Sequence, residues 1–293
     1  LAAHMIANEH LDVLVYPEIG MDPTSKGLAC LRLAPTQGVS WGHPETTGLP
    51  TIDFFLSANL LESESPDAHY RERLIMLPGL GTYFEQPTFA PIEPDFKRLG
   101  ISTQLPLLLC PGSPSKYMPT HDDVFVSIAK KLGMCQFIFF NFDENLTGAF
   151  KKRLHQAFAK EQLNANDYVH FIPFLQKEEF FGLMKKADLY LDTIGFSGFN
   201  TAMQAISCDL PIVTLEGTRM RGRLASGILR ALNLDELICK TKAAYIDLAV
   251  QLIQSPNMRY RLKDNIAKSK ETLFNNLAPI RALESFLSQH KRM

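Results

Sequence analysis

The sequence predicts an α/β protein with two lobes, each built around a parallel β-sheet. Its 293 residues reach the size, roughly 250–300 residues, at which a single hydrophobic core stops growing and a chain divides. From residue 105 onward, short apolar segments alternate with amphipathic helical stretches, a pattern typical of β-α-β units. Proline and glycine are frequent in residues 78–102, and such a stretch favours a connector between lobes.

The first lobe is expected over residues 1–77. Turn chemistry such as Gly48-Leu-Pro50 separates its apolar, strand-like stretches, which lie at residues 12–16, 36–40, 52–57 and 72–77. The chain begins with Leu1 rather than an initiator Met and enters strand-like sequence almost at once. We therefore expect the C-terminal part of a longer protein, with an incomplete first lobe.

The second lobe is expected over residues 103–293. Its predicted strands lie at residues 105–110, 136–142, 168–172, 188–192 and 211–215. The chain then reads as nearly continuous helix, at residues 220–232, 242–254, 256–271 and 279–290. In a parallel sheet with right-handed crossovers, ligands bind outside the carboxyl ends of the strands, so candidate residues are sought there.

Composition indicates an ordinary globular protein whose binding is local. The chain is 46% hydrophobic and 21% charged, and its formal net charge of −1 favours neither a nucleic-acid nor a membrane surface. Five scattered cysteines without zinc spacing indicate free thiols in a reducing compartment. No apolar run reaches the roughly 18–20 residues of a membrane helix. We expect a cytoplasmic protein that contacts neither nucleic acid nor membrane.

The first candidate is Lys116, in the loop that follows the first strand of the second lobe. Proline and glycine residues shape this loop, which precedes a helix predicted over 120–132. A lysine at the carboxyl edge of a sheet can neutralise a diphosphate leaving group. The alternative is a solvated loop lysine.

Lys177 and Phe180 form a second candidate pair, at the start of a helix that follows the strand at 168–172. Residues three apart share a helix face, so the aromatic ring could stack on a base while the ammonium meets ribose or phosphate oxygens. The alternative is that the phenylalanine packs in the core and the lysine belongs to a charged first turn.

A glycine-bearing bend at Gly198 runs into a helix that starts with Asn200 and Thr201. Helix starts carry unpaired N–H groups and partial positive charge, so a phosphate would bind well there. Gln204, one turn later, could bond a ribose hydroxyl. Alternatively, the asparagine and threonine cap their own helix.

His43 is the candidate in the first lobe, on a loop fixed by glycine and proline beside the single tryptophan. A histidine there could act as acid, base or hydrogen-bond donor to a phosphate near neutral pH, although a structural histidine is the common alternative.

Carboxylates at Asp122-Asp123 and at Asp188 and Asp192 could suggest a metal. The first pair suits a helix start and the second brackets a buried strand, so we expect no metal site.

Eight segments in this order resemble the O-linked N-acetylglucosamine transferase family of glycosyltransferases, including bacterial relatives and the cytosolic N-glucosyltransferases of adhesins. The likeness spans residues 12–240. It rests on Arg32–Gln37, Trp41–Asp53, Lys116–Pro119, Lys177–Phe180, Leu191–Thr193, Gly198–Thr201, Pro211–Gly217 and Arg223. The resemblance implies a GT-B fold of two Rossmann-like lobes and inverting, metal-independent transfer from a UDP-sugar to a protein or peptide. It also implies tetratricopeptide repeats upstream of these residues.

The same resemblance implies roles for the candidates. Lys116 matches the lysine that holds the diphosphate and stabilises departing UDP, and Lys177 matches a ribose or phosphate contact. Phe180 stands where the family often has a histidine stacked on uracil, and Asn200 and Thr201 match the phosphate-binding helix start.

Three departures from the family pattern leave the details open. Gln204 replaces a ribose-binding carboxylate, Phe199 a histidine of eukaryotic members, and Glu45 a small residue. Whether the donor carries glucose or N-acetylglucosamine therefore stays open. Two alternatives also remain: a nucleotide-sugar epimerase with the same fold, and a non-catalytic UDP-sugar-binding remnant.

Overall fold

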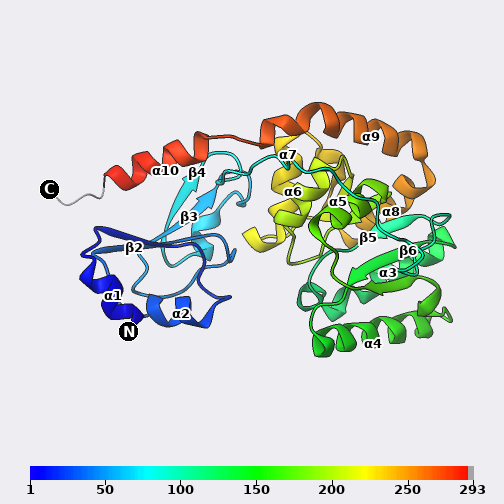
Figure 1. Cartoon of the computed structure of the whole chain (residues 1–293), viewed down its shortest axis with the longest axis horizontal. Helices are drawn as coiled ribbons and strands as arrows, with labels where there is room; N and C mark the ends of the chain where they lie inside the picture. The colour runs from blue at the N-terminus through cyan, green and yellow to red at the C-terminus, as the bar shows by residue number, and fades with distance from the viewer. Residues whose placement is uncertain (290–293) are drawn as a thin grey trace. The chain divides into compact units, whose positions relative to one another are not determined.

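The computed structural model describes residues 1–289, which form two compact units (Figure 1). The chain passes between the units more than once. The first unit comprises residues 1–85, 218–221 and the segment from Asn275 onward, and the second comprises residues 86–217 and 222–274.

The first unit is built on a four-stranded parallel sheet in the order β1-β2-β3-β4. The strands are β1 (Val13–Tyr16), β2 (Thr36–Ser40), β3 (Phe54–Ala58) and β4 (Arg73–Leu77). Its helices are α1 (Ala2–Asn8), α2 (Pro23–Ala29) and α10 (Ala278–Ser288). Every residue of β3 is buried, as expected for a central parallel strand with both faces covered.

The last helix differs from the sequence-based assignment, which placed all of residues 103–293 in the second lobe. In the structure, α10 packs on the first sheet: Leu283 and Phe286 join the core formed by Phe54, Leu56 and Leu77. The Phe54 and Phe286 rings meet edge to face with centroids 4.9 Å apart. The helical period of the segment was predicted correctly, but periodicity does not say which sheet a helix will cover. Residue 290, the predicted end of this helix, lies outside the described residues.

The expected connector at 78–102 is likewise divided between the units, with residues 78–85 in the first and 86–102 in the second. Its second half packs closely, because the backbone carbonyl of Ile92 lies where a Cβ on Gly182 would stand. This stretch is therefore part of the two cores and not a free linker.

The second unit contains a six-stranded parallel sheet in the order β10-β9-β8-β5-β6-β7. Its strands are β5 (Leu107–Leu109), β6 (Gln136–Phe140), β7 (Val169–Ile172), β8 (Leu189–Leu191), β9 (Ile212–Leu215) and β10 (Ile238–Cys239). Its helices are α3 (Asp122–Leu132), α4 (Glu144–Lys160), α5 (Lys177–Lys186), α6 (Asn200–Ser207), α7 (Leu224–Ala231), α8 (Lys242–Gln254) and α9 (Pro256–Ser269). All five strands predicted for this lobe are present, and only the two-residue β10 was not expected.

Helices cover both faces of this sheet (Figure 1). Helix α3 packs against α4 and α8, whereas α6 packs against α5 and α7. This is the doubly wound arrangement that right-handed crossovers produce when the strand order reverses.

The reversal occurs between β5 and β8. The chain moves outward from β5 to β6 and β7, then returns to place β8 on the other side of β5, with Leu108 beside Leu189. At such a switch point the two loops leaving the carboxyl ends diverge and leave a crevice, where doubly wound proteins bind ligands.

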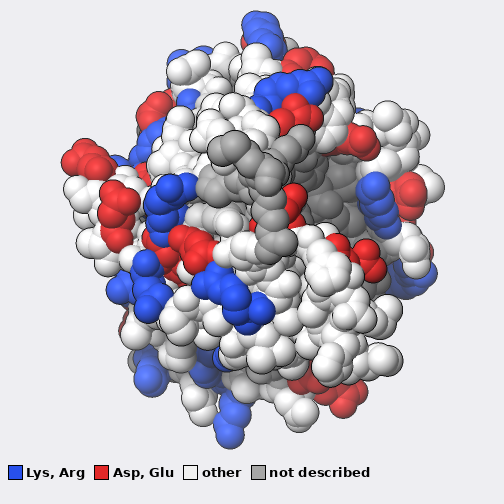
Figure 2. Space-filling view, turned by 90° about the vertical axis from the view of Figure 1, so that its left-hand side faces the viewer, with Lys and Arg blue, Asp and Glu red and all other residues white. Residues whose placement is uncertain are grey.

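Three sequence-based expectations can be compared with the described residues. All five cysteines are free, and four of them are buried. In the part of the chain from 1 to 289, every helix is too short or too polar to cross a membrane. On the face seen in Figure 2, basic and acidic side chains are interspersed, in keeping with the near-zero net charge.

Candidate functional site at the switch point

Lys116 lies at the switch point of the second sheet. Its ammonium is 3.5 Å from the backbone carbonyl of Ser197 and lies 4.3 Å from the centroid of the Phe196 ring. The Lys116 side chain thus reaches from the loop after β5 to the loop after β8. The structure brings Lys116 beside the segment that leads directly into α6, which carries the candidates Asn200 and Thr201.

The loop that carries Lys116 is held rigidly by its neighbour Tyr117. The Tyr117 hydroxyl donates to the Cys110 carbonyl at 2.8 Å and accepts from the Gly112 amide at 3.1 Å. The Tyr117 ring is stacked on Phe150 with centroids 4.6 Å apart. A fixed loop holds the ammonium in place before a ligand arrives, which is what electrostatic stabilisation requires.

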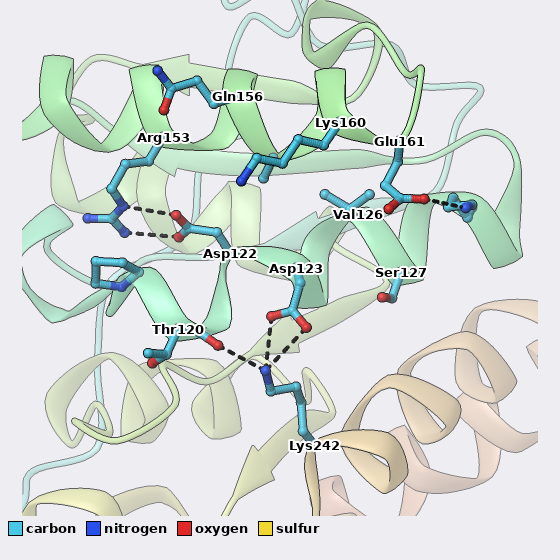
Figure 3. Close-up of a pocket in the computed structure, with 13 residues that line it drawn as sticks. Thr120, Asp122, Asp123, Val126, Ser127, Arg153, Gln156, Lys160, Glu161 and Lys242 are labelled. Carbon is cyan, nitrogen blue, oxygen red and sulfur yellow. Dashed lines mark hydrogen bonds and ion pairs between the residues drawn. The ribbon is translucent and has the colours of Figure 1, made fainter.

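An ion pair between α3 and α4 fixes the same loop from outside (Figure 3). Arg153 makes two 2.9 Å hydrogen bonds to Asp122 and a third, at 2.7 Å, to the Tyr117 carbonyl. Asp123 instead pairs with Lys242 at 3.0 Å. Both carboxylates therefore serve ion pairs, and within residues 1–289 no three His, Cys, Asp or Glu side chains are grouped as a metal ion would require.

The groove between α3 and α4, of about 610 Å³, does not coincide with the switch point. Its walls are polar and charged, and Figure 3 shows Lys160 on α4 pointing towards Asp122 and Asp123 on α3. None of the sequence-predicted site residues lines it. We place the candidate site at the switch point because the cation and the helix start converge there.

A buried carboxylate, Asp192, organises the loop after β8. The side chain is 3% exposed, and its oxygens accept hydrogen bonds from the hydroxyls of Ser197 and Thr214 at 2.6 and 2.7 Å and from the Gly198 amide at 2.9 Å. The Tyr245 hydroxyl donates to the Asp192 backbone carbonyl at 2.9 Å. All three partners of the carboxylate are donors, as an ionised aspartate requires.

Burial acts in opposite directions on the two charges at this site. It raises the pKa of Asp192, while the donated hydrogen bonds and the Lys116 charge oppose the rise. It lowers the pKa of Lys116, and the negative charge of Asp192 opposes that fall. Each group therefore favours the charged form of the other.

Helix α6 begins without a side-chain cap. Asn200 is exposed at its first position, and among the described residues no side chain caps this helix start. The Thr201 hydroxyl shares a 2.9 Å hydrogen bond with Tyr190. A Cβ on Gly198 would lie 2.6 Å from that hydroxyl oxygen, so the bend requires glycine. The capping alternative does not apply here, and the amides of the first turn remain suited to an anion.

The remaining candidates of the second lobe lie on α5 and α6, which pack against each other. Lys177 is exposed and its ammonium lies over the Phe89 ring, 4.4 Å from the centroid. Phe180 is half-buried against Phe140, with centroids 5.4 Å apart. Gln204 is half-buried one turn into α6. The phenylalanine thus packs on a core ring, as the structural alternative expects, while the lysine stays accessible.

In the first unit, His43 packs against Gly20, where an added Cβ would come within 2.8 Å of its ring. Its Nε2 lies 3.9 Å from a carboxylate oxygen of Glu45, and Arg221 pairs with the same carboxylate at 2.7 Å. Glu45, which departs from the family pattern, therefore links the histidine to a guanidinium.

Glu72 anchors the loop that carries His43. It is 5% exposed and accepts a 2.6 Å hydrogen bond from the Thr46 hydroxyl, a 2.8 Å hydrogen bond from the Thr47 amide, and another from the Thr47 hydroxyl. Burial would raise the pKa of Glu72, but these hydrogen bonds outweigh it and the pKa lies below its ordinary value.

Other motif residues of the first unit are structural. Arg32 makes a two-point ion pair with Asp53 at 2.5 and 3.0 Å. The buried Gln37 amide donates to the carbonyls of Leu31 and Thr51. These contacts tie the entry of β2 to the entry of β3.

The sequence reasoning missed Ser197 and Glu72, and it assigned no role to Asp192. An acidic residue directly after a buried strand is a usable signal for the aspartate, since it marks the carboxyl edge. No local pattern distinguishes Glu72 from a surface acid, because its partners lie 25 and 26 residues earlier.

Comparison with known proteins identifies the family. The model of glycosyl transferase family 41 matches residues 119–281, more than half of the chain. The chain belongs to glycosyl transferase family 41. The matched region contains α3, the starts of α5 and α6, and the loop after β8.

Individual relatives are distant in sequence. A probable UDP-N-acetylglucosamine–peptide N-acetylglucosaminyltransferase SPINDLY of Petunia hybrida is 25% identical over 90% of this chain and 28% of its own length. A UDP-glucose:protein N-β-glucosyltransferase of Actinobacillus pleuropneumoniae is 22% identical over 89% of this chain and 42% of its own. The chain thus spans well under half the length of these curated relatives.

Solved structures share the fold. A mutant O-GlcNAc transferase of Thermobaculum terrenum matches 99% of this family 41 chain and 54% of its own, with a TM-score of 0.82 at 22% identity. A glycosyltransferase of Rickettsia africae matches 100% of this chain and 80% of its own, with a TM-score of 0.60 at 11% identity. The expected GT-B-like α/β fold is confirmed.

Proposed function

We propose that this family 41 chain is the catalytic C-terminal portion of a glycosyltransferase that moves N-acetylglucosamine or glucose from a UDP-sugar to a protein or peptide side chain. The observation that carries the proposal is the meeting of Lys116 with the loop that enters the uncapped start of α6. A cation beside free backbone amides suits a diphosphate.

The choice of donor and acceptor draws on the relatives. One relative is named for UDP-N-acetylglucosamine and a peptide, and another for UDP-glucose and a protein. Both names share a UDP-sugar donor and a polypeptide acceptor. The sugar itself stays open between the two.

In the proposed reaction, an acceptor oxygen or nitrogen attacks the anomeric carbon as its bond to the β-phosphate oxygen breaks. The bonding electron pair leaves with UDP, and the acceptor proton passes to a base. Attack opposite the leaving group inverts the anomeric centre. Lys116 and the amides of α6 stabilise the developing charge on UDP, so the proposed step uses no metal ion.

We assign the nucleoside to the first turns of α5 and α6. Lys177 would meet ribose or phosphate oxygens, Phe180 would contact the base, and Gln204 would bond a ribose hydroxyl. His43 is the proposed acid, base or phosphate hydrogen-bond donor of the first unit.

Replacing Lys116 tests this assignment. Lys116→Ala should lower turnover with UDP-sugar and acceptor by about a hundred- to a thousandfold, because a charge that stabilises the leaving group is lost. The matched control is Lys151→Ala, which removes an exposed lysine from α4. Turnover in full-length protein, with far-UV circular dichroism as the check on folding, measures the effect. Full activity of Lys116→Ala would refute the role.

Incubation with donor alone separates the alternatives. An epimerase would rearrange the sugar without acceptor, whereas a transferase needs the acceptor. A binding remnant would show UDP binding in calorimetry and no transfer by the full-length protein.

We further propose that tetratricopeptide repeats precede this portion and that it acts in the cytoplasm.

A further inference from the structure

Asp192 fixes the loop that carries two groups in contact with the Lys116 ammonium. The Ser197 carbonyl and the Phe196 ring both belong to the loop that the Asp192 carboxylate fixes through Ser197 and Gly198. The Ser197 hydroxyl also accepts a 2.8 Å hydrogen bond from the Ala225 amide at the start of α7. The loop is therefore tied to both β8 and α7.

The three donors around Asp192 favour an ionised acceptor, and burying such a charge is costly. Here the carboxylate lies 3% exposed at the edge where the lysine is half-buried. It is the charged side chain that acts on Lys116.

We propose that Asp192 is a positioning residue for the donor diphosphate: its carboxylate fixes the Ser197–Gly198 segment that the Lys116 ammonium contacts, and it places a negative charge close to that ammonium. This inference rests on the proposed function and extends it to a residue that does not touch the donor. Because the charge of Asp192 acts on Lys116, Asp192 should alter the pH dependence of UDP binding through the protonation of Lys116.

Other titratable groups packed around the pair do not compete for this role. Burial raises the pKa of the neighbouring thiol and phenols, so they stay neutral: Cys110, Tyr117, Tyr190 and Tyr245. His121 and Asp122 line the same small cavity of about 20 Å³ as Asp192. Burial lowers the pKa of His121, and Asp122 is paired with Arg153.

The test is UDP affinity, measured by calorimetry from neutral to alkaline pH. In the wild type, affinity should fall as Lys116 loses its proton. In Asp192→Asn the fall should come about one pH unit lower, the size of effect that a nearby opposite charge has on a pKa. An asparagine can still accept from the Gly198 amide, and the two hydroxyls can turn to accept from its NH₂ group, so this variant should fold.

Two control variants isolate the charge. Thr214→Val removes one hydrogen bond to Asp192 but keeps its charge, so the alkaline midpoint should stay at the wild-type value. Lys116→Arg keeps a cation at every pH used. In the Lys116→Arg background, Asp192→Asn should no longer shift the pH midpoint at which UDP affinity falls. Any fall in UDP affinity that remains at alkaline pH then reports the deprotonation of uracil itself.

The outcomes are distinct. If the pH midpoint of UDP affinity in Asp192→Asn equals that of the wild type, or if Asp192→Asn and Thr214→Val shift it equally, the inference is overturned. The proposed function would still stand, because UDP binds in either case. Absence of UDP binding to the wild type would instead overturn the proposed function. In that case the ¹³Cε NMR titration of Lys116, assigned with Lys116→Arg, still tests the inference: an equal Lys116 midpoint with and without Asp192→Asn would refute it.

Discussion

In each unit a buried carboxylate holds a candidate loop, but the pKa values of the two carboxylates are shifted in opposite directions. In the first unit, Glu72 accepts hydrogen bonds from Thr46 and Thr47, and its pKa lies below the ordinary value. In the second unit, Asp192 also accepts three hydrogen bonds, yet burial raises its pKa. At Glu72 the hydrogen bonds outweigh the desolvation of the carboxylate, so the ionised form is favoured. At Asp192 desolvation outweighs the hydrogen bonds, so the ionised form is disfavoured.

The pH dependence of stability differs accordingly. The Glu72 contribution is present above the unfolded pKa, about 4.3, and is lost as pH falls through the lower folded pKa. Asp192 has a folded pKa above the unfolded value of about 3.9, so stability falls as pH rises between the two. The two carboxylates therefore contribute to the pH dependence of stability with opposite signs.

The largest expected effect comes from breaking the second loop at Gly198. In Gly198→Ala the new Cβ would stand 2.6 Å from the Thr201 hydroxyl and 2.8 Å from that of Tyr190, so the packing at the start of α6 must change. Overpacking of this kind costs about 1–3 kcal/mol. We expect UDP affinity in calorimetry to fall at least about tenfold, which is 1.4 kcal/mol.

The matched control for this change is Gly148→Ala in α4. No atom lies within 4 Å of the added Cβ, and alanine favours a helix by about 0.5–1 kcal/mol. This variant should be slightly more stable and should bind UDP normally. If both alanine variants bind UDP equally well, the start of α6 does not form the diphosphate site.

A smaller effect is expected from neutralising the anchor of the first loop. Glu72→Gln replaces hydrogen bonds to a charge with weaker neutral ones, and should lower the free energy of unfolding by about 1–2 kcal/mol at neutral pH. The loss should diminish as pH falls toward the folded pKa of Glu72, because protonation removes the same charge from the wild type. Urea denaturation at several pH values measures it.

The corresponding amide variant at Asp192 should behave differently in the same urea denaturation experiment. Asp192→Asn should leave the free energy of unfolding at neutral pH within about 1 kcal/mol of the wild type, or raise it, since a buried charge is removed while its partners adapt. Equal destabilisation by the two amide variants would show that the anchors are equivalent and would contradict the distinction drawn above.

The smallest effect is expected at Glu45, in the loop that Glu72 holds. Its ion pair with Arg221 is partly exposed, with side chains 32% and 42% accessible, and such pairs contribute about 0–1 kcal/mol. Glu45→Ala should therefore change the urea midpoint only slightly, and less so at high salt. A loss as large as that of Glu72→Gln would mean that Glu45 also anchors the loop.

Periodicity and turn residues were sufficient to predict most of the fold. The stretch expected at 36–40 is β2, the helix expected at 242–254 is α8, and each remaining apolar stretch overlaps a strand. The two-residue β10 carries too short a pattern to detect. Which of the two sheets α10 covers depends on its packing against Phe54 and Leu77, which no local pattern encodes.

The candidate site was predictable in part. Lys116 and the start of α6 follow strands, so a parallel sheet places both at one edge. Their contact through Ser197 could not be predicted, because it depends on how the bend at 192–198 folds around a buried carboxylate. The packing of Phe180 on Phe140 likewise depends on neighbouring strand ends.

By itself, the sequence determined the α/β class, the positions of the strands and the motifs that place the chain in family 41, because hydrophobic period and residue spacing are local properties. Tertiary structure alone decided which buried carboxylate holds which loop, and with what effect on its pKa. The reason is that desolvation and hydrogen bonding depend on groups brought together from distant parts of the chain: the Thr214 hydroxyl lies 22 residues from Asp192, and Tyr245 lies 53 residues away.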